Sequence, residues 1–130
     1  MIEIRSGAQP ASADAAATGV LLARITRDGA DWSEGPAVAG LAFVADGRHA
    51  RKSPAQSWQL RGLASGEAGW FRLISSVADA GTTSTQFARI DGAIGLEGQT
   101  GDFQAFLKTL AITPDTTIEI ADWWYSPSSF

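Results

Sequence analysis

Short apolar runs separated by turn-forming residues are the feature that most constrains the fold of this 130-residue chain. Glycine is abundant, at 14 residues, and clusters of Gly, Pro, Asp and Ser interrupt the apolar runs. Within the runs, apolar and polar residues alternate, as in Ile2-Glu3-Ile4-Arg5. This period of two is typical of a half-buried β-strand, and no stretch shows the 3.6-residue repeat of an amphipathic helix. The sequence therefore predicts an all-β fold.

The segments with this pattern predict seven to nine short antiparallel strands. They are residues 2–5, 19–27, 39–45, 57–63, 69–77, 85–94, 102–107, 109–112 and 116–125. Asp-Gly pairs at 28–29 and 46–47 are expected to form turns. So many short strands favour a two-sheet β-sandwich, jelly-roll-like if the strands run as two Greek keys.

The length suits a single domain spanning residues 1–130, with residues 126–130 as a flexible C-terminal tail. Residues 7–18 (GAQPASADAAAT) carry no large side chain that could anchor a helix, so we expect a loop. We expect this loop and the tail to reach neighbouring subunits and to become ordered on assembly.

The charge balance bears on possible partners. The net charge is −4 and the sequence pI is about 4.8, which gives no electrostatic reason to bind nucleic acid. No apolar run approaches the roughly 20 residues of a membrane span, and the N-terminus does not resemble a signal peptide. We expect synthesis in the host cytoplasm. The basic stretch 48–52 is interpreted as a solvated loop, or alternatively as a contact to an acidic partner surface.

Residues able to support catalysis or to bind a metal are scarce. The chain has no Cys and one His, His49, which lies between Arg48 and Arg51. A zinc site would need carboxylates alone to complete it, and no nucleophile, phosphate or dinucleotide motif is present. We therefore expect no enzyme activity, no metal and no cofactor.

Acidic residues leave one catalytic alternative open. Asp91, Glu97, Asp102 and Asp122 could supply the two carboxylates of a glycosidase if two of them lay about 5–10 Å apart. For Asp91 we favour a turn, because Asp followed by Gly suits a tight reversal of the chain.

Five Trp residues are candidates for the core or for an interface. Trp58 and Trp70 fall inside predicted strands and are expected in the core. Trp123 and Trp124 are neighbours on a strand, so one of them should point away from the core. An outward Trp suits a subunit contact, with core packing and a sugar-stacking platform as alternatives. The candidate interface residues are Trp32, Trp123, Trp124, Tyr125 and Phe130.

Several phrases of the sequence resemble a group of small proteins encoded by tailed phages and prophages. They are IRSGAQPASADAAATGVLLA at 4–23, AGWFRL at 68–73, IDGAIG at 90–95, and the final strands around 110–112 and 117–120. These phrases cover most of the chain and carry no catalytic residues. The segment DFQAFL at 102–107 and the WWY at 123–125 depart from the pattern of the group. The resemblance implies a β-rich component of the virion or of its assembly.

The resulting functional hypothesis is a head decoration (cement) protein that bridges capsid subunits in the virion. Its partners would be the major capsid protein or tail proteins, and we expect homo-oligomers, with no nucleic acid and no membrane. The alternatives are a tail-end component (baseplate, fibre or adaptor domain), a carbohydrate-binding host-recognition module and a hydrolase.

Overall fold

The computed structural model describes residues 1–33, 40–75 and 77–125, and every regular element in these ranges is a strand. The strands are β1 (Ile2–Ser6), β2 (Leu21–Arg27), β3 (Phe43–Asp46), β4 (His49–Lys52), β5 (Trp58–Gly62), β6 (Gly66–Ile74), β7 (Arg89–Leu96), β8 (Ala105–Leu107), β9 (Ala111–Ile112), β10 (Thr117–Ile120) and β11 (Trp124–Tyr125). The all-β prediction is confirmed. The described residues form no helix that could cross a bilayer.

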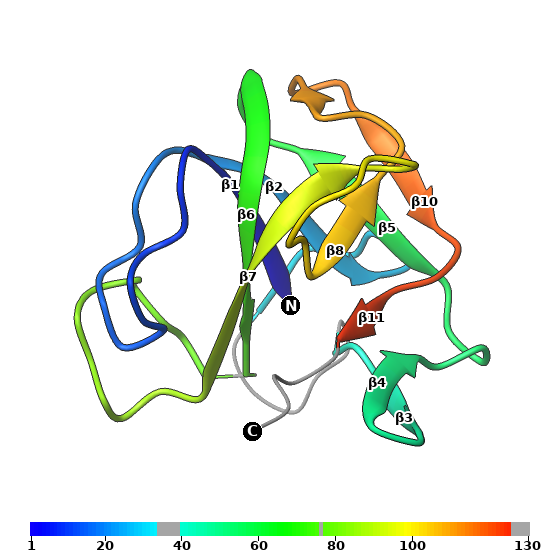
Figure 1. Ribbon diagram of the computed structural model, residues 1–130, viewed down its shortest axis with the longest axis horizontal. Helices are drawn as coiled ribbons and strands as arrows, with labels where there is room; N and C mark the ends of the chain where they lie inside the picture. Colours follow the sequence, from blue (N-terminus) through cyan, green and yellow to red (C-terminus); the bar gives the residue numbers. More distant parts are fainter. Residues whose placement is uncertain (34–39, 76, 126–130) are drawn as a thin grey trace.

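The strands divide unequally between two sheets (Figure 1). The large sheet has the order β10-β5-β2-β1-β6-β7-β8, with β9 paired to β6 beside this path, and it curls into a half-barrel. The small sheet has the order β11-β4-β3. The predicted two-sheet jelly roll is not confirmed, because the large sheet curls around most of the core by itself.

The expectation of purely antiparallel pairing is wrong for one pair. β8 runs parallel to β7, with Ile94 beside Ala105 and Leu96 beside Leu107. A hairpin would have reversed the chain after β7. Residues 97–104 instead carry the chain back along β7, so that the next strand starts in the same direction.

The inner face of the large sheet carries the apolar side of the alternating pattern. One cross-strand row crosses six strands and consists of Ile118, Leu60, Ile25, Ile2, Leu73 and Ile90. Two aromatic pairs extend the core beside this row. Phe43 of the small sheet meets Trp58 at 5.1 Å between ring centroids, and Phe71 meets Trp123 at 5.1 Å, both edge to face. Trp58 is buried in this core, as predicted, whereas Trp70 is fully buried on the outer face of the sheet.

The outer face of the large sheet buries charge. Its central row runs through Arg61, Arg24, Glu3, Arg72 and Asp91 on five successive strands. Arg72 donates from Nε and Nη2 to the two carboxylate oxygens of Asp91 at 2.7 and 2.8 Å, and both side chains are buried. The Arg72 guanidinium also lies over the ring of Trp70.

Two long loops, 7–20 and 77–88, lie together beside the sheet and form a side lobe (left of Figure 1). They are joined by backbone bonds from Ala17 N to Gly81 O and from Ser84 N to Asp14 O. Arg89, whose side chain is fully buried, binds both oxygens of Asp79 at 2.6 Å and donates to carbonyl oxygens of both loops. The loop 7–18 is therefore held by the chain itself and does not need assembly to order it.

The prediction of a turn at Asp91-Gly92 is wrong. Both residues lie inside the continuous strand β7, and Asp91 is the ion-pair partner of Arg72. Gly92 serves close packing, because a Cβ there would lie 2.5 Å from Cε1 of Phe71. The Asp-Gly pairs at 28–29 and 46–47 do form turns, with positive φ at Asp28, Gly29 and Gly47.

Two further local predictions need correction. The basic stretch 48–52 is not a solvated loop, because residues 49–52 form β4, the central strand of the small sheet. The segment 116–125 is not one strand: β10 belongs to the large sheet and β11 to the small one. The chain changes sheet at Ala121-Asp122, and no local pattern marks this crossing. The predicted flexible tail, 126–130, lies outside the described residues.

Gly92→Ala is expected to destabilise the fold by about 1–3 kcal/mol, because the added methyl group overpacks the site against Phe71. Urea denaturation measures the change. The same substitution in a Phe71→Leu background should cost less, because the smaller side chain relieves the clash. Equal costs in the two backgrounds would contradict this account of Gly92.

The Asp79–Arg89 ion pair should make stability depend on acidity. The hydrogen bonds from Arg89 outweigh the opposing effect of burial and hold the pKa of Asp79 below its ordinary 3.8. The ion pair therefore stabilises fully above that pH, and the contribution is lost as the pH falls through the lowered pKa.

Asp79→Asn is expected to lower the free energy of unfolding by about 3–5 kcal/mol at neutral pH, because it leaves the buried Arg89 side chain without its counter-charge. The variant should also lose less stability than the wild type on acidification below 3.8. Denaturant titrations at several pH values measure both effects. Asp31→Asn, at an exposed position, is the control and should behave like the wild type.

Candidate protein-binding surface

One face of the small sheet presents an aromatic residue, a cation and an apolar residue side by side. Trp124 of β11 lies opposite Arg51 of β4, which lies opposite Val44 of β3. Trp124 is 45% exposed and Val44 42%. The β3–β4 hairpin that carries two of these residues closes on the Asp46-Gly47 turn, so a local signal positions this part of the surface.

Arg51 and Asp122 fix the orientation of Trp124. The guanidinium of Arg51 lies 4.7 Å from the centre of the Trp124 ring. It donates to Asp46 Oδ2 and to Asp122 Oδ2, both at 2.9 Å. Asp122 Oδ2 also accepts a hydrogen bond from Trp124 Nε1 at 2.8 Å. The centre of the His49 ring lies 5.2 Å from the centre of the Trp124 ring. These contacts restrict the orientation of the exposed Trp124 ring.

The electrostatics of this network favour the charged forms. Partial burial raises the pKa of Asp122, but hydrogen bonds from Trp124 and Arg51 act more strongly together, and the pKa lies below its usual value. The hydrogen bonds to Asp46 and Asp122 raise the pKa of Arg51. Both shifts favour the charged forms of Asp122 and Arg51.

A cleft of about 390 Å³ adjoins this face, between Trp124 on one side and the β8 region on the other. Phe106, 43% exposed, lies on the far wall and contacts Phe103 edge to face at 5.9 Å. Glu97 and Gln104 add polar groups to the walls. We call Trp124, Arg51, Val44, Asp122 and Phe106 the aromatic surface.

The structure describes four of the five predicted interface residues and places them differently. Trp123 is only 3% exposed and packs in the core against Phe71, whereas its neighbour Trp124 points outward. Tyr125 is partly buried against the core. Trp32 is half-buried and lines a different cavity. Phe130 lies outside the described residues.

The four candidate carboxylates do not form one group. Asp91 faces Arg72 on the outer side of the large sheet, and Asp102 is exposed. Glu97 and Asp122 both line the cleft of about 390 Å³. Asp122 accepts hydrogen bonds from Arg51 and from Trp124 Nε1. The described residues contain no group of three or more His, Cys, Asp or Glu that could hold a metal ion.

Sequence reasoning missed Arg51 and Phe106 as members of this surface. The sequence analysis interprets the basic stretch 48–52 as a solvated loop or as a contact to an acidic partner surface. Nothing in the neighbourhood of Arg51 indicates its ion pair with Asp122. Phe106 lies in a segment expected to be a strand, where alternation with buried Ala105 and Leu107 could have predicted that it points outward.

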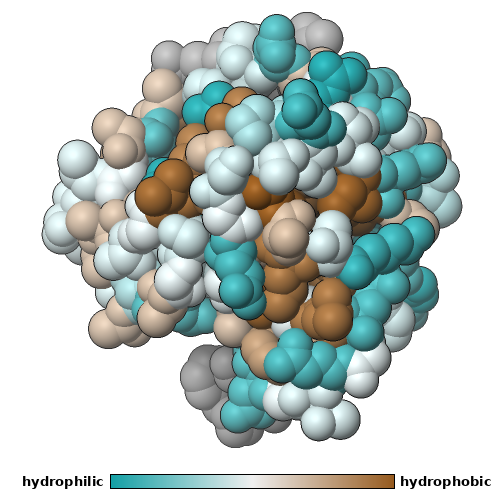
Figure 2. Space-filling model, turned by 90° about the horizontal axis from the view of Figure 1, so that it is seen from above, coloured by the Kyte–Doolittle hydropathy of each residue, from teal (hydrophilic) through white to brown (hydrophobic). Residues whose placement is uncertain are grey.

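A second apolar area lies at one end of the molecule. Seen from the end where β5, β7 and β8 finish, apolar residues gather within a polar rim (Figure 2). The large exposed residues at these strand ends include Leu63 and Leu96. Contiguous apolar area of this kind on a small protein suits contact with another macromolecule.

Comparisons with protein-family models, with curated proteins and with solved structures each found no match to this chain.

The two adjacent tryptophans should differ sharply in their contribution to stability. Trp123→Ala is expected to lower the free energy of unfolding by about 3–5 kcal/mol, because it leaves a cavity beside Phe71. Trp124→Ala should cost about 1 kcal/mol or less, because the side chain is half exposed. Urea denaturation of both variants tests this difference. Similar losses for the two variants would mean that Trp124 is part of the core.

Proposed function

We propose that this chain is a structural subunit of a bacteriophage particle, most simply a head decoration protein that bridges capsid subunits through protein–protein contacts. The observation that carries the proposal is the exposed Trp124, held in place by Arg51 and Asp122. Trp and Arg are the residue types that most often dominate the energy of protein interfaces.

The fixed geometry of the aromatic surface supports a role in binding. A free Trp side chain would lose rotamer entropy when a partner covers it. The Asp122 hydrogen bond and the Arg51 guanidinium have already restricted Trp124 within the subunit. Val44 and Phe106 extend the apolar contact area on both sides, so a partner would gain burial without further ordering of this face.

The phage context of the proposal comes from the sequence resemblance to small tailed-phage proteins. A capsid also multiplies weak contacts, because each subunit repeats the same interface many times. The exposed apolar end of the molecule offers a second contact area, which bridging of two neighbours requires. A homo-oligomer on the capsid surface would use both areas, and the chain would be made in the host cytoplasm.

Two other placements share the same surface. A tail-end component would use Trp124 in the same way but would be present in few copies. A carbohydrate-binding module would stack a sugar ring on Trp124 or Phe106 and use Glu97 and Gln104 for its hydroxyl groups. Binding on a glycan array that is lost in Trp124→Ala would favour the carbohydrate role.

The proposal is tested with phage particles from the genome that encodes this chain. Quantitative mass spectrometry of purified wild-type particles should find the chain in numbers comparable to the capsid protein, and cryo-electron microscopy should place it on the head. Low copy number and density at the tail would instead support the tail-end role. Absence of the chain from purified particles would refute a virion role altogether.

The contribution of Trp124 is measured by adding purified chain to particles that lack it. Trp124→Ala should bind at least about tenfold more weakly, because a hot-spot residue contributes about 2 kcal/mol or more. Val20→Ala, at another exposed apolar position, is the matched control and should bind like the wild type. Equal binding of the two variants would exclude the aromatic surface as the interface.

A further inference from the structure

Strand β7 has an edge that is only partly covered. On one side it pairs with β6 from Arg89 to Ala93. On the other side β8 covers Ile94–Leu96, and Gln104 exchanges two hydrogen bonds with the backbone of Ala93. Among the described residues, no strand pairs with Arg89–Gly92 on this second side.

The direction of the free hydrogen-bonding groups follows from the alternation of the strand. The backbone N–H and C=O of Ala93 point away from β6, toward Gln104. In a regular strand the residues two and four positions earlier point the same way. The backbone groups of Asp91 and Arg89 therefore face the uncovered side, whereas those of Ile90 face β6.

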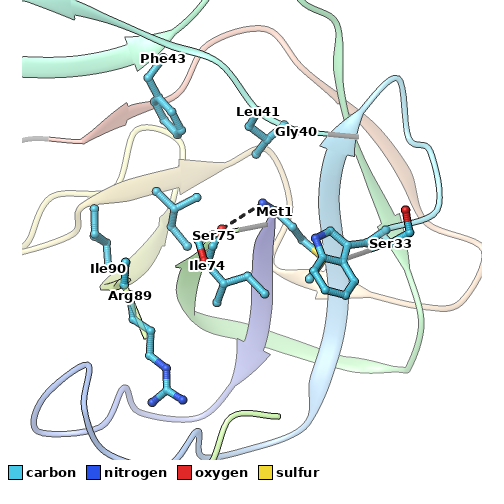
Figure 3. A pocket seen from close by; sticks show the side chains of 12 residues that line it. Met1, Ser33, Gly40, Leu41, Phe43, Ile74, Ser75, Arg89 and Ile90 are labelled. Carbon is cyan, nitrogen blue, oxygen red and sulfur yellow. Dashed lines mark hydrogen bonds between the residues drawn. The ribbon is translucent and has the colours of Figure 1, made fainter. Parts of the chain in front are cut away.

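An apolar cavity of about 510 Å³ lies on the inner side of this same edge (Figure 3). Ile90 of β7 and Leu73 of β6 line it from the large sheet, and Leu41 and Phe43 line it from the β3 side. The Arg89 side chain points away from the cavity, toward the side lobe (Figure 3). The side chains of an added strand that lie beside Ile90 would enter this cavity.

We propose that the β7 edge and this cavity form a strand-addition site for an extended segment of another protein with apolar residues at alternate positions. Main-chain hydrogen bonds to Arg89 and Asp91 would hold the segment, and the cavity would select its apolar side chains. The open edge is only a few residues long, between the side lobe and Gln104. An extended segment matches so short an edge, because it needs only a few main-chain groups and alternate apolar side chains to bind. The site is distinct from the aromatic surface and does not depend on the proposed function.

The experiment uses the full chain and a fluorescein-labelled synthetic peptide of alternating valine and serine. Fluorescence anisotropy should show saturable binding. The same peptide with methyl groups on alternate backbone nitrogens should bind about tenfold more weakly or worse, because one main-chain hydrogen bond is worth about that factor. Hydrogen exchange followed by NMR should show slower exchange of the Arg89 and Asp91 amides with peptide, and no change at Ile90.

Two variants separate binding at this cavity from unspecific adhesion. Ala88→Trp places a large ring at an exposed residue that lines the cavity, and it should weaken binding about tenfold or more. Ala11→Trp adds the same ring at an exposed position that does not line the cavity, and it should bind like the wild type.

Three outcomes of the peptide experiment would overturn the proposal. They are no saturable binding of the unmethylated peptide, equal binding of the methylated peptide, or unchanged exchange at Asp91. Dimerisation of the chain alone with protection of the same amides would also overturn it, because a second copy would then be the occupant. None of these results depends on whether the chain is found in phage particles.

Discussion

The buried guanidinium of Arg72 is the interaction on which the rest of the structure depends. It binds Asp91 of the neighbouring strand with two hydrogen bonds and donates a third to the carbonyl of Ala15 in the side lobe. It also lies over Trp70, whose ring is fully buried on the outer face. The outer face of the large sheet is buried in part by the side lobe, and the hydrogen bond from Arg72 to Ala15 joins the side lobe to the sheet. Loss of this cation would leave Asp91 buried without a counter-charge.

The two proposed contact sites differ in whether their hydrogen-bonding groups are satisfied within the chain. Where hydrogen-bonding groups are satisfied within the chain, as around Arg51 and Asp122, the surface is rigid and offers a preformed contact. Where no described strand pairs with the outer edge of a strand, as along the first residues of β7, main-chain donors and acceptors face outward. We propose a folded partner for the first kind of site and an extended partner for the second.

Much of the fold could be predicted because the signals are local. Alternation placed most of the strands, and the Asp-Gly pairs at 28–29 and 46–47 placed two turns correctly. The same dipeptide misled at 91–92, because a buried arginine on the adjacent strand outweighed its turn preference. The candidate site was predictable only in part: one outward Trp was expected, but its identity depended on where the chain changes sheet after Ile120.

The sequence by itself determined that this chain forms short strands, where most of them lie, and which large residues are available to a core. These are properties of neighbouring residues, which alternation and turn chemistry express directly. Only the tertiary structure decided that Trp123 is buried and Trp124 is exposed, and that Arg51 meets Asp122 across 71 residues of sequence. Such pairings depend on how the sheets curl and cross, and no local stretch of sequence encodes that geometry.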